Sequence, residues 1–258
     1  GFRSINWDAV APTSPVSDDQ LATFPGDFFN TNAFPRARGA LITMDSNMMA
    51  TFRLSAAPNV SGSAPELFGE PGEFSVFGAP RLFGMTGGNM LEVKFMDPVH
   101  PSQPATVDGF GAVFTGNELA GSTFIEFYDQ TGLMLHRTEA PVTSGGGLSF
   151  AGATFADSVI AMVRISSGTV GIDMCGMEMM NSTADCVAMD DFIYGEPQPT
   201  GPMVDFVDAG SDSASIVDTV DRFKAALGPA NAPEPVNNAD GFRSINWDAV
   251  APTSPVSD

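Results

Sequence analysis

The chain has 258 residues, of which 31 are acidic and 11 basic, so its formal net charge is −20. A surface this negative repels phosphate backbones and anionic lipid headgroups, which argues against nucleic-acid binding and membrane binding. No apolar run reaches the length of about 18 residues that spans a membrane. The charge instead attracts divalent cations and suits a protein kept soluble in salty or extracellular surroundings.

From residue 1 to 196 the sequence has the pattern of an all-β protein. Short segments rich in Val, Ile, Phe and Thr alternate with clusters of Gly, Pro, Asn and Asp. Because no helical pattern lies between them, we predict a two-sheet antiparallel β-sandwich, jelly-roll-like, for residues 1–196. The predicted strands are Arg3–Asp8, Ala40–Met44, Ala50–Ala56, Phe74–Phe77, Met90–Met96, Gly109–Thr115, Thr123–Tyr128, Leu133–Thr138, Leu148–Phe155, Ile160–Ser166, Thr169–Met174 and Val187–Tyr194.

The composition changes after Glu196, and residues 197–240 are predicted to form a linker with one short connector helix at about 215–227. Four apolar side chains recur there at helical spacing and form one stripe. A helix of about three turns is marginal in water by itself, so we expect the stripe to dock on another surface. The stripe consists of Ile216, Val220, Phe223 and Leu227.

The segment GFRSINWDAVAPTSPVSD occupies residues 1–18 and recurs unchanged at residues 241–258. A β-sandwich has one position for its first strand, and a second copy left in water would expose large apolar groups and an unpaired strand. We therefore predict that residues 241–258 belong to the next repeat or subunit and connect neighbours head to tail, which builds a fibre if the rotation does not close. The expected contact residues are the helix stripe with Phe2, Ile5, Trp7, Phe242, Ile245 and Trp247.

Two arrangements of such units remain open. In the first, one long chain carries near-identical repeats with a period of 240 residues, since residue 1 matches residue 241. This arrangement predicts that the sequence continues after Asp258 with DQLATFPGDFFN. In the second, separate chains exchange the strand, and the C-terminal copy fills a position in another molecule.

The two cysteines, Cys175 and Cys186, are predicted to form a local disulfide, which is typical of exported proteins. A pair of buried free thiols is the alternative. A calcium site is predicted from Asn6 and Asp8 on the first strand with Asp190 and Asp191 on the last, because these strands are commonly adjacent in jelly rolls and Ca²⁺ prefers oxygen ligands. We expect Asp191 to point inward. The alternative is a polar strand end or a turn cap.

Catalytic patterns are weak. The two histidines, His100 and His136, lie in a proline-bracketed loop and a hairpin strand, and no G-x-S-x-G is present, so we predict no enzyme. The polar-edged aromatics Trp7 and Tyr194 could bind a sugar, although core packing is favoured.

Five motifs together resemble a group of largely uncharacterised, secreted bacterial β-sandwich proteins, often surface-sorted. They are FKAALG, GFRSINWDAV, FPGDFFN, GFGAVFTG and VAMDDFIYGEP. The resemblance implies fold and export and no established activity. It also implies that the natural unit begins at the helix near Ser213, continues through Gly241 and ends at MDDFIYGEP. Ala9 replaces the group's glycine after INWD, and Gly116-Asn117 replaces its acidic residue after GAVFT, so no metal site is carried over at those positions.

These observations predict a structural repeat unit of an extracellular filament or long surface adhesin, whose partner is a neighbouring copy of itself. The alternative is a calcium-stabilised carbohydrate-binding module of a secreted protein, with surface glycans as ligands. Both interpretations place the protein outside the cell or on its surface.

Overall fold

The fold is known from a computed structural model. Two compact units are distinguished, residues 1–201 and residues 202–258, and each is described by itself. The structure describes residues 1–7, 26–34, 36–44, 51–55, 67–70, 72–78, 81–177, 183–200, 207, 209 and 213–227, to which all structural statements refer.

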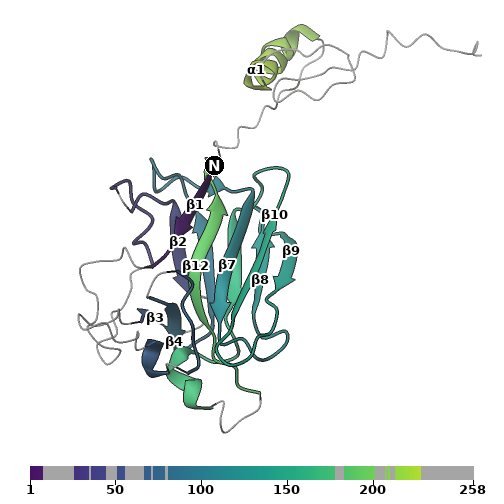
Figure 1. The fold of residues 1–258 in the computed structure, drawn as a ribbon. Helices are drawn as coiled ribbons and strands as arrows, with labels where there is room; N and C mark the ends of the chain where they lie inside the picture. Colours follow the sequence, from purple (N-terminus) through teal and green to yellow (C-terminus); the bar gives the residue numbers. More distant parts are fainter. Residues whose placement is uncertain are drawn as a thin grey trace, which may run out of the picture. The chain divides into compact units, whose positions relative to one another are not determined.

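The first unit is an antiparallel β-sandwich, as predicted (Figure 1). Its first sheet has the strand order β10 (Leu148–Thr154), β7 (Gly109–Thr115), β12 (Ala188–Gly195), β4 (Phe83–Thr86) and β3 (Thr51–Leu54), and β1 (Phe2–Ile5) also pairs with β12. The second sheet has the order β2 (Ala40–Met44), β5 (Met90–Phe95), β11 (Met162–Ser166), β8 (Phe124–Tyr128) and β9 (Met134–Glu139). Two short strands, β6 (Ala105–Thr106) and β13 (Gln198–Pro199), form a third ladder.

The core lies between the two main sheets and is dominated by phenylalanine. Alternation along a strand sends every second side chain to one face. On β7, Phe110 and Phe114 therefore lie in the core, and Phe127 on β8 belongs to the same cluster. Fully burying one such side chain stabilises the fold by roughly 1.5–3 kcal/mol.

The short strands β6 and β13 were not predicted, and several other strands differ in their bounds. Three larger differences concern the presence of a strand. Residues 74–77 form no strand, and Phe74 is buried against a small separate cluster that includes Leu82. Within the predicted strand Thr169–Met174, a 3₁₀ helix begins at Ile172 and runs to Met177. Strand β4 was not predicted, because its flanking glycines resemble a turn. Gly84 within it makes room for Ile172, since a Cβ there would lie 2.8 Å from the Ile172 side chain.

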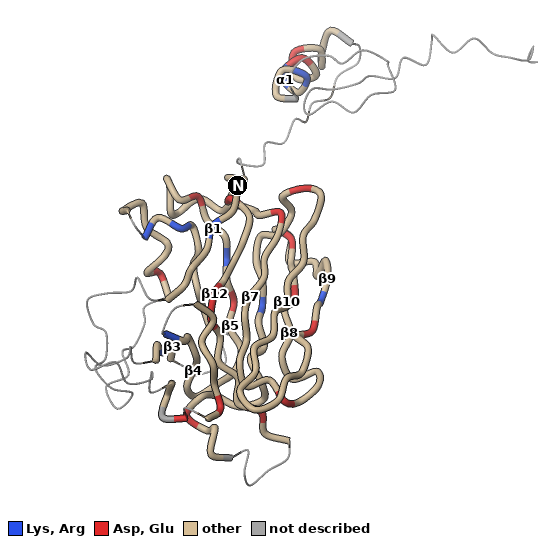
Figure 2. The backbone as a smooth tube through the Cα atoms, in the orientation of Figure 1, with Lys and Arg blue, Asp and Glu red and all other residues tan. Residues whose placement is uncertain are grey.

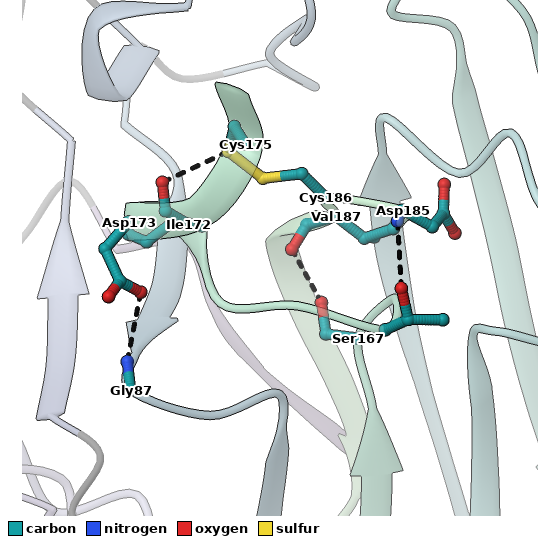
Figure 3. The surroundings of a disulfide bond; sticks show 9 residues. Gly87, Ser167, Ile172, Asp173, Cys175, Asp185, Cys186 and Val187 are labelled. Atoms are coloured by element: carbon teal, nitrogen blue, oxygen red, sulfur yellow. Dashed lines mark hydrogen bonds between the residues drawn. A yellow bond between two sulfur atoms is a disulfide. The ribbon is translucent and has the colours of Figure 1, made fainter. Parts of the chain in front are cut away.

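Cys175 and Cys186 form the predicted disulfide (Figure 3). The bond joins the 3₁₀ helix Ile172–Met177 to the residues just before β12. Hydrogen bonds fix both sides, since the Gly87 amide donates to Asp173 Oδ1 at 3.0 Å and the Ser167 hydroxyl donates to the Val187 carbonyl at 2.8 Å.

The second unit contains helix α1, Val217–Leu227, preceded by a 3₁₀ turn at Ser213–Ser215. The helix begins two residues after the predicted start. Val220 and Phe223 of the predicted stripe are 39% and 47% exposed, and Ile216 is half-buried. Docking of this stripe stays a prediction, as do the predicted domain boundaries.

Replacement of both Cys175 and Cys186 by serine should lower the free energy of unfolding of the sandwich. The bond joins residues separated by 11 positions, and closing a loop of this size in the unfolded chain stabilises the fold by about 3 kcal/mol. Urea denaturation with and without a reductant measures this loss. The reduced wild type should match the double variant, and an unchanged midpoint would contradict the structural role of the bond.

Candidate functional site

Residues 2–7 occupy one edge of β12, and we call the surface that receives them the first-strand seat. The strands are antiparallel, with Phe2 opposite Gly195 and Ile5 opposite Phe192. The Arg3 guanidinium binds both carboxylate oxygens of Glu196, one of them through Nε at 2.9 Å, and also donates to the Ala37 carbonyl. The seat therefore combines a sheet ladder with a two-point ion pair.

Trp7 is the anchor of this strand and is fully buried. Its backbone φ of +36° lies in the left-handed region, which turns the chain out of the strand and is rare for a bulky residue. The indole N–H donates to the Asp190 carbonyl at 2.7 Å. The ring stacks on Phe83 with centroids 4.1 Å apart and meets Phe192 edge-on at 5.0 Å. The buried indole is thus satisfied in both its polar and its apolar contacts.

A β-bulge in β12 contains the acceptor for Trp7. Phe114 of β7 lies opposite Met189 and Ala112 lies opposite Phe192, so Asp190 and Asp191 together face one residue of β7. A bulge of this kind interrupts the ladder and redirects side chains. The Trp7 indole donates to the carbonyl of Asp190, which lies in this bulge.

The two aspartates of the bulge differ in burial, and the more buried of them is not Asp191, which we expected to point inward. Asp190 is fully buried, and its Oδ2 accepts the Phe77 amide at 2.6 Å, whereas Asp191 is half-buried. The extra bulge position breaks the two-residue period, so simple alternation does not decide the direction of these side chains. Desolvation raises the pKa of the Asp191 carboxyl, and a hydrogen bond with Asp190 partly opposes this.

Of the four predicted calcium ligands, the structure describes Asn6, Asp190 and Asp191. Asn6 is exposed, and Asp8 lies outside the described residues. Among those residues, no group of three or more His, Cys, Asp or Glu side chains is placed to hold a metal ion. Calcium binding therefore stays a prediction that depends on Asp8.

Three motifs of the resemblance, GFRSINWDAV, FPGDFFN and VAMDDFIYGEP, meet around this seat. Phe29 of FFN packs edge-on against Trp7 at 5.9 Å, and the Tyr194 hydroxyl of the last motif donates to the Arg38 carbonyl at 3.0 Å. Trp7 and Tyr194 are 0% and 2% exposed, so their interpretation as core residues is confirmed. Phe83 was missed as a partner of Trp7, because no strand was predicted around it.

The predicted contact residues divide between the two faces of the first sheet. Ile5 is 2% exposed and lies in the core with Trp7. Phe2 is paired with Gly195 and is 75% exposed, so it adds no buried side chain, and its role in seating the strand stays a prediction. The copies Phe242, Ile245 and Trp247 lie outside the described residues. Buried contacts at the seat thus come from Ile5 and Trp7.

The histidines are placed apart from the seat. His100 Nδ1 lies 2.8 Å from Asp97 Oδ2, and His136 packs near the Phe127 ring with centroids 6.0 Å apart. Hydrogen bonds from the Val99 amide and from His100 lower the pKa of Asp97. Absence of enzymatic activity stays a prediction.

Three carboxylates lie together beside the start of β12. The Glu118 amide donates to Asp185 Oδ1 at 3.0 Å, and the Ser122 hydroxyl donates to the other oxygen of Asp185. Although Glu118 keeps part of its surface in water, desolvation of its carboxyl and then the charges of Glu73 and Asp185 raise its pKa to about 7. This group is protonated more readily in the folded protein than in the unfolded chain.

No family model and no curated protein matches this chain. Among solved structures, it is similar to the CBM22-1 and GH10 modules of Clostridium thermocellum endo-1,4-beta-D-xylanase 10B complexed with xylohexaose, at 12% identity and a TM-score of 0.31. The similarity covers 74% of this chain and 30% of that one. A second similar structure is the enzymatically active domain of Bacteriophage CBA120 tailspike protein 4, at 12% identity and a TM-score of 0.29. This similarity covers 67% of this chain and 21% of that one. Likenesses this weak support no inference about function.

Removal of both tryptophan anchors should destabilise the sandwich strongly. The variant Trp7→Ala with Trp247→Ala loses the buried indole and cannot replace it from the second copy, so we expect a loss of about 3–5 kcal/mol in urea denaturation. Trp247→Ala alone is the matched control, because it removes the same side chain from the same local sequence. Equal losses in both variants would contradict the assignment of Trp7 to the seat.

Glu118→Gln should change how stability depends on pH. Because its folded pKa of about 7 lies above the usual 4.5, Glu118 favours folding at low pH and loses this contribution as pH rises through 7. At pH 8 the variant should unfold about 1–3 °C above the wild type, and at pH 4 the two should coincide. The exposed Asp157→Asn is the control in thermal unfolding. If the unfolding temperatures of the variant and the wild type differed by the same amount at pH 4 and pH 8, the raised pKa of Glu118 would be excluded as the cause of that difference.

Proposed function

We propose that this protein is a structural repeat unit of an extracellular filament or long surface adhesin, joined head to tail through its duplicated first strand. One observation carries the proposal. The first-strand seat is filled by residues 2–7 of the chain, with Trp7 fully buried, while residues 241–247 repeat the same side chains in the same order.

Each unit receives one first strand at this seat. Strand β12 pairs with β7 along one edge, and β1 and β4 share its other edge. A second copy therefore cannot enter the seat while residues 2–7 occupy it. An identical segment is matched in shape and hydrogen bonding to the equivalent seat of another unit.

The free energy that drives the segment into a neighbour is hydrophobic. Burial of an isoleucine or a tryptophan of the kind seen at Ile5 and Trp7 stabilises by roughly 1.5–3 kcal/mol for each side chain. The residues of the copy, Ile245 and Trp247, gain this only where a seat is vacant. Repeats on one chain or strands exchanged between chains both satisfy the condition.

The disulfide between Cys175 and Cys186 supports an oxidising location outside the cytosol, because such bonds persist in extracellular compartments. Among the described residues, no helix combines the length and the apolar character needed to cross a membrane. Export to the cell surface is part of the proposal.

A chain that lacks residues 1–18 should assemble. Its seat is empty, so the segment at 241–258 of one molecule is expected to fill the seat of the next and to give a ladder of oligomers. Sedimentation velocity over a hundredfold concentration range measures this. The full chain, whose seat is filled, should sediment mainly as a monomer under the same conditions.

The matched control is the same shortened chain with Trp247→Ala, which should remain small and less stable. A shortened chain that stays a stable monomer at every concentration has folded its own C-terminal copy into its seat, or needs none, and either result contradicts head-to-tail linkage. Oligomers that persist in the Trp247→Ala control would also contradict it.

A further inference from the structure

The outer faces of the two main sheets differ sharply in chemistry. The second sheet carries crossed ion pairs, with Arg164 Nη2 at 2.9 Å from Glu92 Oε1 and Arg137 Nη1 at 3.7 Å from Glu126 Oε1. Figure 2 shows acidic and basic positions along β9. This face has the composition of an ordinary solvated surface.

The first sheet has no such charges on its central and edge strands β7 and β10, whose sequences are GFGAVFT and LSFAGAT. With Phe110 and Phe114 turned inward, the outward positions of β7 begin with two glycines. Gly152 of β10 lies opposite Gly111 of β7, whereas the β12 residue opposite Gly111 is Ile193. Gly195 of β12 lies opposite Phe2 of β1. Glycines of three strands, together with Ile193, therefore form the floor of this face.

Two exposed phenylalanines line a groove of about 370 Å³ over this floor. Phe150 is 54% exposed and Phe2 is 75% exposed. The Phe150 ring lies across these glycines, because a Cβ on Gly111 would stand 2.4 Å from its Cζ atom. Polar groups at the lining are the exposed Asp108 and Thr154. The glycines thus make room for the Phe150 ring, which lies over the floor of the groove.

The groove restricts the chemistry of its occupant. A peptide strand cannot add to β7 there, because β7 is already hydrogen-bonded to β10 on one side and to β12 on the other. The net charge of −20 and the carboxylate of Asp108 disfavour an anion. A volume of about 370 Å³ is that of a small-ligand site rather than of a protein interface.

We propose that this groove binds a neutral glycan, with one sugar ring stacked on Phe150 and the next residue of the glycan toward Phe2. A pyranose ring has an apolar face of C–H groups that packs flat on an aromatic ring, and a rim of hydroxyls. The Asp108 carboxylate accepts hydrogen bonds from such hydroxyls, and the Thr154 hydroxyl both donates and accepts. Apolar walls with a few polar groups at the rim are typical of ligand sites.

The site is distinct from the core contacts of the first strand, although the two share that strand. Side chains alternate, so Phe2 faces the groove while Ile5 faces the core. Whichever copy of the segment fills the seat also supplies this phenylalanine, as Phe2 or as Phe242. Glycan binding by the full chain does not require assembly, so the two proposals fail independently.

Isothermal titration of the full chain with neutral hexasaccharides of glucose, xylose, mannose and N-acetylglucosamine tests the site. We expect at least one to bind, and Phe150→Ala to weaken that binding about tenfold or more. Phe150→Trp should preserve it, and Phe2→Ala should weaken it less. Phe34→Ala is the matched control, since Phe34 is 94% exposed and lies outside the groove. Thermal unfolding confirms that each variant is folded, as expected for exposed positions.

Several results would overturn the proposal. Failure to bind any of the four oligosaccharides excludes a neutral glycan of these classes. Binding that survives both Phe150→Ala and Phe2→Ala places the ligand elsewhere. An equal loss in Phe34→Ala indicates nonspecific adsorption. Loss of self-association rather than of glycan binding in Phe150→Ala would assign the groove to a protein contact.

Discussion

Burial of the Trp7 indole beneath the bulge of β12 is the interaction on which the rest of the structure depends. Asp190 lies in the bulge, and the indole N–H donates to its backbone carbonyl at 2.7 Å. Stacking on Phe83 then joins the first strand to β4, a pairing that is far apart in the sequence. An unsatisfied buried indole or carbonyl would each destabilise the fold, so the two features require each other.

The first strand gives the sandwich two surfaces at once. Its inward residues complete the core and its outward residue, Phe2, stands at the edge of an apolar groove. A segment that contributes to both faces of the sheet is a suitable connector. Its insertion adds the last side chains of the core and, at the same time, the phenylalanine at the edge of the groove. The ion pair between Arg3 and Glu196 fixes the register of β1 on β12.

Sequence patterns were sufficient for the regular parts of this fold. Strands β2 and β7 have the predicted bounds, because alternating apolar residues and flanking turn signals define them. Patterns failed where contacts between distant residues determine the structure. Strand β4 is an example, because the Ile172 side chain packs where a Cβ on Gly84 would stand. The burial of Asp190 could not be predicted, since a bulge is a property of two paired strands rather than of one. The groove was missed because glycines at outward strand positions look like loop glycines in one sequence.

The most direct test of the account is a disulfide trap at the seat. Ser4 and Ile193 are opposite one another across β1 and β12, and Ser244 is the copy of Ser4. In a chain that lacks residues 1–18 and carries Ser244→Cys with Ile193→Cys, oxidation should link successive molecules, giving a covalent ladder on a non-reducing gel. With residues 1–18 present the ladder should disappear. Monomers whose engineered cysteines stay unlinked, or link within one chain, would contradict head-to-tail insertion of the repeated strand.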